Sequence, residues 1–82
     1  MDVALADVLT TVRQFVEKKQ GAAARPIEAE TPLLREGHID SFGLVELIAD
    51  LQQQLHITIA DGDLIPEDFE TPRTLFERLE AL

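Results

Sequence analysis

The sequence predicts an all-α fold: a small bundle of three main helices plus one short helix, with a long first loop. Three segments repeat apolar residues at helical spacing, and the four prolines lie between these segments or at the start of one. No strand is predicted. With 82 residues, the chain fits one domain, because chains usually need more than about 150 residues before a second core forms. We therefore expect residues 1–82 to be a single domain.

The first predicted helix begins at Leu5 and stops near Gly21. Asp2 is a candidate cap for its N-terminus, and Lys18 and Lys19 favour the negative end of the helix dipole at its C-terminus. Its apolar face consists of Leu5, Val8, Leu9, Val12, Phe15 and Val16.

A long irregular segment, residues 21–40, follows this helix. Pro26 and Pro32 bar helix interiors here. Loops of this length are usually functional or disordered, but apolar anchors within the segment favour an ordered loop. These anchors are Ile27, Leu33, Leu34 and Ile39.

The second helix is predicted from about Ser41 to Leu55. Asp40 is a natural N-cap, because its carboxylate can accept hydrogen bonds from the unpaired backbone N–H groups of the first turn. One continuous apolar stripe marks the buried side of this helix: Leu44, Leu47, Ile48, Leu51 and Leu55.

Residues 56–70 form the second connection, which has Ile57 and Ile59 as apolar anchors and a short turn near Pro66 to Phe69. The last helix begins at Thr71-Pro72, a capping residue followed by proline at the first helical position. The predicted core face of this helix consists of Leu75, Phe76, Leu79 and Leu82.

Negative charge is concentrated in the middle of the chain. Residues 28–70 contain eleven acidic residues and one basic residue, Arg35, and the net charge of the whole chain is −9. Such a field repels nucleic acids and anionic membranes, and it accelerates encounters with basic protein surfaces. We therefore expect protein partners rather than a nucleic acid or a membrane, with solubility as the alternative role of the charge.

Several classes of protein are excluded by what the sequence lacks. It contains no cysteine, so it has neither a disulfide nor a thiolate metal site. Its two histidines, His38 and His56, are too few for a zinc site, and we expect no metal. The N-terminus lacks the basic and apolar regions of a signal peptide, and no apolar run is long enough to span a membrane. These features predict a cytoplasmic protein.

The second helix carries apolar residues on its outer side. Phe42, Val45 and Ala49 lie roughly 100–160° around the helix from Leu44, so they cannot join the buried stripe. The carboxylates of Glu46 and Asp50 come next to them. An exposed apolar strip edged by acids is suited to docking a partner that carries basic residues around an apolar patch. The alternative is that Phe42 folds back under the preceding loop and Val45 is half-buried.

Ser41 follows the capping residue, so its hydroxyl is not needed for capping and should point to solvent. A phosphate attached there would lie near unpaired backbone N–H groups and the positive end of the helix dipole. The alternative is that Asp40 and Ser41 are simply a redundant helix start.

The residues from Gly37 to Leu47, Gly-His-Ile-Asp-Ser-Phe-Gly-Leu-Val-Glu-Leu, resemble the phosphopantetheine attachment motif of acyl and peptidyl carrier proteins. The resemblance extends over most of the chain, including a Thr-Pro-Leu-Leu segment in the long loop, and it implies an acyl-carrier-like fold. The Gly-x-x-Asp-Ser form and the segment Pro66–Pro72 look closer to D-alanyl and other aminoacyl carriers than to fatty-acid carriers.

The resemblance also implies a cofactor and partners. A phosphopantetheinyl transferase would move the 4'-phosphopantetheine arm of coenzyme A onto Ser41, while Asp40 shapes the helix start and helps the transferase recognise it. The residues that meet partner enzymes would be Phe42, Val45, Glu46, Ala49 and Asp50.

We therefore expect a monomeric carrier, with one carrier domain over residues 1–82, that holds an acyl or aminoacyl group as a thioester. The protein itself would not be an enzyme. Loading would require an adenylating ligase or an acyltransferase, and a downstream acceptor enzyme would receive the group.

Two other functions compete with this one. The first is a cofactor-free helical interaction module that docks through the exposed face of the second helix. The second is a small hydrolase that uses His38, Asp40 and Ser41, but a catalytic triad needs a base held against the hydroxyl and an oxyanion hole in a pocket. We expect His38 instead to be a loop residue that contacts the arm or the transferase.

Overall fold

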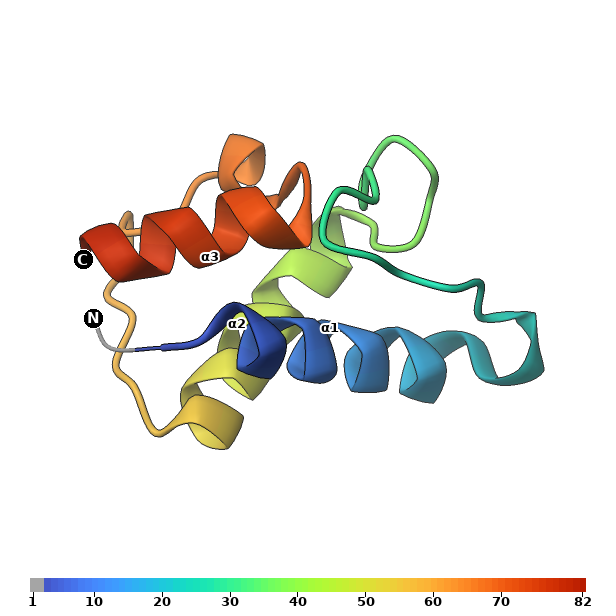
Figure 1. The fold of residues 1–82 in the computed structure, drawn as a ribbon, viewed down its shortest axis with the longest axis horizontal. Coiled ribbons are helices and arrows are strands. Elements are labelled where there is room, and N and C mark those ends of the chain that lie inside the picture. The colour runs from blue at the N-terminus through green and yellow to red at the C-terminus, as the bar shows by residue number, and fades with distance from the viewer. Residues whose placement is uncertain (1–2) are drawn as a thin grey trace.

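The computed structural model describes residues 3–82 and confirms the predicted all-α class, with no strand among these residues. The elements are α1 (Leu5–Gln20), a short 3₁₀ helix η1 (Gly21–Ala23), α2 (Ser41–Leu55), a second 3₁₀ helix η2 (Pro66–Phe69) and α3 (Pro72–Ala81). Figure 1 shows α1 and α3 running in opposite directions, with α2 crossing them obliquely. The molecule measures 33 × 20 × 20 Å.

The hydrophobic core lies where α1 packs against both α2 and α3. It combines the helical stripes that the sequence predicted with anchors from both connections. Each such side chain contributes roughly 1.5–3 kcal/mol on full burial, so the core fixes the angle at which α2 crosses the other helices. The buried apolar residues are Val8, Val12, Phe15, Val16, Ile27, Leu33, Ile39, Leu44, Leu47, Leu51, Ile59, Phe69, Leu75 and Leu79.

The two ends of α1 differ in how well they were predicted. Asp2, the predicted cap, lies outside the described residues, and Ala4 occupies the N-cap position with no side-chain hydrogen bond. The predicted stop at Gly21 is confirmed: this residue has a φ of 56°, which glycine adopts without the steric cost of a Cβ.

The first connection, residues 24–40, is ordered by hydrogen bonds to the last helix as well as by its buried anchors. The backbone N–H of Leu33 donates to the carbonyl of Glu70 at 2.9 Å, and the N–H of Arg73 donates to the carbonyl of Ala29 at 2.9 Å. These bonds join the middle of the connection to the beginning of α3.

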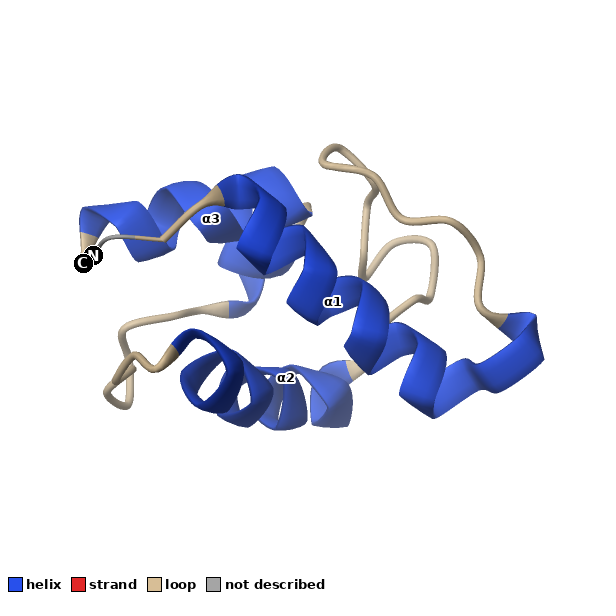
Figure 2. Cartoon of the chain, turned by 60° about the horizontal axis from the view of Figure 1, so that its bottom comes forward, coloured by secondary structure: helices blue, strands red, loops and turns tan. Residues whose placement is uncertain are grey.

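The same connection is also attached to α1. Arg13 donates from Nε to the carbonyl of Ile27 at 2.8 Å, and Gln20 donates from Nε2 to the carbonyl of His38 at 3.0 Å. The connection is therefore held from both sides, as Figure 2 shows in its path beside α1 toward the beginning of α2.

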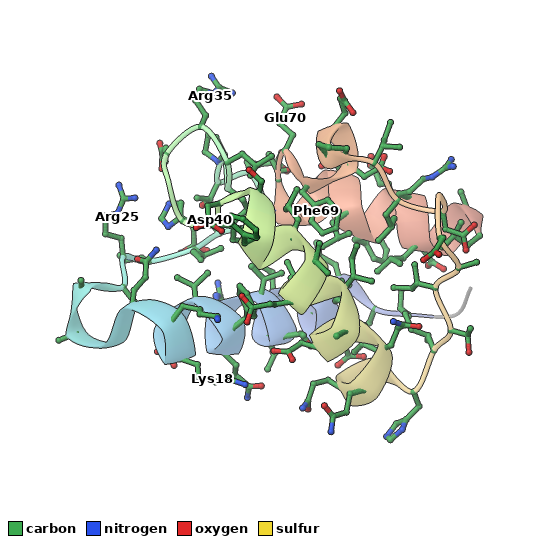
Figure 3. All side chains as sticks on the ribbon, turned by 180° about the vertical axis from the view of Figure 1, so that it is seen from behind. Lys18, Arg25, Arg35, Asp40, Phe69 and Glu70 are labelled. Atoms are coloured by element: carbon green, nitrogen blue, oxygen red, sulfur yellow. The ribbon has the colours of Figure 1, made fainter. Side chains whose placement is uncertain are left out.

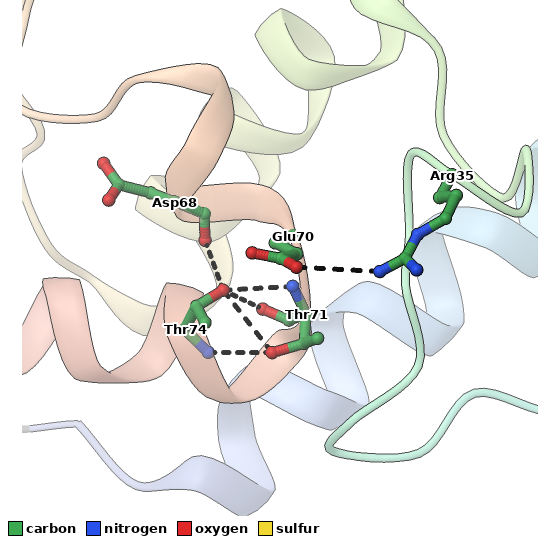
Figure 4. Close-up of polar contacts among 5 residues, drawn as sticks. All are labelled: Arg35, Asp68, Glu70, Thr71 and Thr74. Atoms are coloured by element: carbon green, nitrogen blue, oxygen red, sulfur yellow. Dashed lines mark hydrogen bonds and ion pairs between the residues drawn. The ribbon is translucent and has the colours of Figure 1, made fainter.

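The junction between η2 and α3 is a network of side-chain caps (Figure 4). Thr71 and Thr74 cap each other: the N–H of Thr74 donates to Thr71 Oγ1 at 3.1 Å, and the N–H of Thr71 donates to Thr74 Oγ1 at 3.0 Å. Thr74 Oγ1 in turn donates to the carbonyl of Asp68 at 3.0 Å. Arg35 of the first connection lies 3.6 Å from Glu70 at this junction, and Figure 3 shows both on the same side of the molecule.

One predicted core residue is wrong. Leu82 is 36% exposed, because α3 ends at Ala81 and Leu82 does not continue its helical stripe. Seven further predicted core or anchor residues are half-buried rather than buried: Leu5, Leu9, Leu34, Ile48, Leu55, Ile57 and Phe76. The short turn predicted within the second connection is confirmed as η2.

The ends of the described chain lie together at one end of the molecule, whereas the first connection lies at the opposite end (Figures 1 and 2). The beginning of α2 lies next to this connection. Among the described residues, no helix combines the length and the apolar character needed to cross a bilayer.

Candidate functional site

Ser41 is the first residue of α2, and it is exposed. Its hydroxyl makes no hydrogen bond within residues 3–82, so no neighbouring group occupies it. The preceding connection, held to α1 and α3, brings the chain to this point in a fixed direction. The result is a free primary hydroxyl on a firmly held helix start.

Asp40 is the N-cap of α2, as the sequence predicted. Its Oδ1 accepts a hydrogen bond from the backbone N–H of Gly43 at 2.7 Å, and its carbonyl accepts from the N–H of Leu44 at 3.1 Å. The carboxylate also places a negative charge at the positive end of the helix dipole. Figure 3 shows Asp40 at the beginning of α2.

Two backbone donors remain available beside the hydroxyl. The N–H groups of Ser41 and Phe42 have no acceptor within the described residues, because the cap satisfies only the donors further along the turn. Unpaired N–H groups at a helix N-terminus are well suited to a phosphate group. The residues present at this position therefore fit a phosphate ester on Ser41.

Gly43 is a part of the site whose role sequence reasoning missed. A Cβ at this position would lie 3.0 Å from Ile39 Cγ2 and 3.2 Å from Asp40 Oδ1. The absence of a side chain lets the end of the first connection pack closely against the first turn and lets the capping carboxylate reach its donor. The glycine in the first turn of the predicted helix was the only signal in the sequence.

The outer side of α2 is exposed. Phe42 is 84% exposed and Val45 is 69% exposed, and Ala49 is exposed as well. The alternative in which Phe42 folds back under the loop and Val45 is half-buried is therefore wrong. Glu46 is also exposed on this helix, whereas Asp50 is half-buried.

The acidic edge of this surface has partners that the sequence did not reveal. Lys19 Nζ lies 2.5 Å from Glu46 Oε2, and Lys18 Nζ lies 3.8 Å from Asp50 Oδ2. Lys19 Nζ also lies 5.9 Å from the centre of the Phe15 ring. The two lysines were assigned to the dipole of the first helix, but they reach across to α2.

The prediction for His38 is wrong. Its side chain is 1% exposed, so it contacts neither a mobile arm nor an approaching enzyme. The ring packs beneath the connection with Nε2 3.3 Å from Glu36 Oε1, and Nδ1 has no partner within the described residues. No hydrogen bond links His38 to the Ser41 hydroxyl among these residues, which removes the geometric basis of the hydrolase alternative.

Most of the chain resembles a known protein family. The family described as the phosphopantetheine attachment site matches residues 4–79. The chain is 30% identical over 53 residues to proteins called D-alanyl carrier protein from Bacillus mycoides (strain KBAB4), Bacillus cereus (strain B4264) and Bacillus anthracis (strain CDC 684 / NRRL 3495). Each match covers 65% of this chain and 67% of the relative. The resemblance that the sequence motif indicated is thereby confirmed.

Proposed function

Because the chain belongs to the family of phosphopantetheine-binding carrier proteins, we propose that Ser41 is the residue to which the 4'-phosphopantetheine arm is attached. Proteins of this family are carriers, so the chain itself is not an enzyme. The observation that supports Ser41 is its exposed hydroxyl at the beginning of α2, next to two unpaired backbone N–H groups. Ser41 is also the only serine in the sequence.

In the attachment reaction, Ser41 and Asp40 have different roles. Ser41 Oγ loses its proton and forms the new bond to phosphorus, and the nucleotide part of coenzyme A leaves with the other phosphate. Asp40 holds the first turn in place through its cap. When bound, the arm supplies a terminal thiol, which the cysteine-free chain lacks, and this thiol can hold an acyl or aminoacyl group as a thioester.

The family works with a phosphopantetheinyl transferase and with ligases or synthetases that load the carrier. We propose that such enzymes meet the outer face of α2, formed by Phe42, Val45, Glu46, Ala49 and Asp50. Three of these side chains are apolar and exposed, as a docking surface requires. We propose that the protein works in the cytoplasm, where ATP and coenzyme A are available for loading by an adenylating ligase or an acyltransferase. We also propose that it is a monomer with one carrier domain.

The cargo that we propose is an aminoacyl group, with D-alanine as the first candidate. Support for this choice comes from the names of the relatives, each called a D-alanyl carrier protein. A downstream acceptor enzyme would then receive the amino acid from the thiol.

Intact-mass spectrometry tests the attachment site. Incubation with coenzyme A, Mg²⁺ and a promiscuous transferase should add one phosphopantetheine unit to the wild type. Ser41→Ala should add none, whereas Thr58→Ala, which removes another exposed hydroxyl, should be modified at the wild-type rate. An unmodified wild type, with a known carrier modified in the same tube, would leave the cofactor-free interaction module as the better explanation.

The cargo is tested separately on the modified protein. An adenylating ligase from one of the three Bacillus species, supplied with ATP and D-alanine, should add one alanyl group to the arm. L-alanine and glycine are the matched controls. Loading of another amino acid in preference to D-alanine would contradict the proposed cargo while leaving Ser41 as the attachment site.

A further inference from the structure

The acidic edge of the docking face is paired with lysines from the same chain. Lys19 reaches Glu46 from the last turn of α1, with Nζ 2.5 Å from Oε2, and Lys18 reaches Asp50, with Nζ 3.8 Å from Oδ2. Two negative and two positive charges therefore lie together on this side of the molecule. Their formal sum is zero, although the chain as a whole carries −9.

Such exposed pairs add little to stability, and their effect is on the electric field. The side chains of Lys18, Lys19 and Glu46 are 72%, 46% and 52% exposed, and ion pairs of this kind are typically worth about 0–1 kcal/mol. At distances larger than the spacing within each pair, however, an approaching protein senses mainly the sum of the paired charges, and the Debye length of about 8 Å at physiological salt limits this field to the neighbourhood of the face. The two lysines thus cancel the long-range attraction that the two carboxylates would exert.

The position of Lys19 makes this cancellation relevant to docking. Lys19, Glu46 and Phe42 line one cavity of about 310 Å³, which Asp40 also lines. The cavity adjoins the outer face of α2 through Phe42 and Glu46, which belong to both. Contact with the Phe15 ring, 5.9 Å from Nζ, gives Lys19 a second partner on its own helix.

We propose that Lys18 and Lys19 determine the partner specificity of the docking face by neutralising Glu46 and Asp50. The face then selects enzymes that dock through apolar contact with Phe42 and Val45, and it gives no electrostatic advantage to enzymes with a densely basic docking surface. This inference rests on the proposed function, because it takes the outer face of α2 as the surface that partners meet. It replaces the simpler expectation of an acidic docking edge that attracts basic partners.

A measurement of the local electrostatic potential tests, without any partner enzyme, whether Lys18 and Lys19 neutralise Glu46 and Asp50. Small cationic and anionic nitroxides are added in turn at about 0.15 M salt, where the Debye length of about 8 Å screens the distant part of the chain's −9 charge, and the NMR relaxation enhancement of the backbone N–H groups of residues 45–49 is compared. In the wild type the cationic and the anionic probe should enhance this relaxation about equally. In Lys18→Gln/Lys19→Gln the cationic probe should act about two- to fivefold more strongly than the anionic one.

The matched control is Arg73→Gln/Arg78→Gln, which removes the same number of positive charges from α3. In this control, the ratio of the cationic to the anionic relaxation enhancement at residues 45–49 should stay near the wild-type value. A wild-type ratio that already favours the cationic probe severalfold would overturn the proposal, as would a shift of the same size in the control.

The effect of the two lysines on partner specificity is tested with the transferase reaction. With a transferase whose carrier-binding surface is basic, Lys18→Gln/Lys19→Gln should be modified at Ser41 about two- to fivefold faster than the wild type at low salt, and at an equal rate at high salt. An unchanged rate at low salt would show that the lysines do not set specificity. If Ser41 were modified in no variant, the proposed function would fail instead, and the nitroxide ratios would still report the charge of the face.

Discussion

The two sides of α2 both carry large apolar residues, but these residues have opposite environments. On the inner side, Leu44, Leu47 and Leu51 are at most 8% exposed, while on the outer side Phe42 and Val45 are 84% and 69% exposed. A helix of a small domain normally places polar residues opposite its core stripe. The comparison teaches that the inner side accounts for the fold, whereas the apolar outer side is not needed for it and is available for the contact with other proteins that we propose.

The largest effect on the free energy of unfolding is expected from a substitution on the inner side of α2. Leu47 is fully buried, so Leu47→Ala should lower the free energy of unfolding by about 2–5 kcal/mol through lost burial and a residual cavity. Urea unfolding followed by circular dichroism measures this change. Val45→Ala on the outer side is the matched control, and an equal loss in both variants would contradict the division between the two sides.

A smaller effect on the free energy of unfolding is expected at the beginning of α2. Asp40→Ala removes the acceptor of the Gly43 N–H and should cost about 0.5–2 kcal/mol. Asp40→Asn should retain most of the stability, because asparagine caps equally well. A slower modification of Ser41 in the Asn variant, which keeps its cap, would separate recognition of the charge from capping. Full stability in the Ala variant would argue against the cap.

At the C-terminal end of α2, we expect a substitution that raises the free energy of unfolding rather than lowers it. His56 has a φ of 54°, a left-handed conformation that costs a residue with a Cβ about 1–2 kcal/mol. His56→Gly relieves this cost but gains entropy in the unfolded chain, so we expect a net stabilisation of up to about 1 kcal/mol. Thermal unfolding measures it, and His56→Ala, which keeps the Cβ, should show no gain.

The smallest effect on stability is expected on the outer side. Because Phe42 is 84% exposed, Phe42→Ala should change the free energy of unfolding by no more than about 0.5 kcal/mol. The same variant should be modified by the transferase more slowly than the wild type, since the docking face loses its largest apolar side chain. A loss of stability like that of Leu47→Ala would instead mean that Phe42 is part of the core.

The features that the sequence predicted correctly all depend on neighbours along the chain. The helical stripes, the Asp40 cap and the start of α3 after Thr71 are set by residues within one or two turns, so periodicity and capping chemistry are sufficient to find them. The exposed outer side of α2 follows from the same geometry. The motif around Ser41 is likewise a local pattern.

The features that the sequence did not predict depend on how α1 crosses α2. Glu46 is 27 residues from Lys19, and nothing in the local pattern brings the two together. His38 is polar and lies in a loop, yet the bonds that hold this loop to α1 bury its ring. The close contact of Gly43 with Ile39 has the same origin, because it exists only once the first connection has folded back onto the helix.

The shared location of the two chain ends has a practical consequence. Both ends of the described chain lie away from the first connection and from the beginning of α2 (Figure 1). An affinity tag, a fluorescent label or a tether to a solid support can therefore be joined at either end without covering the hydroxyl of Ser41. The carrier can be immobilised on a sensor surface with its reactive position facing the solution.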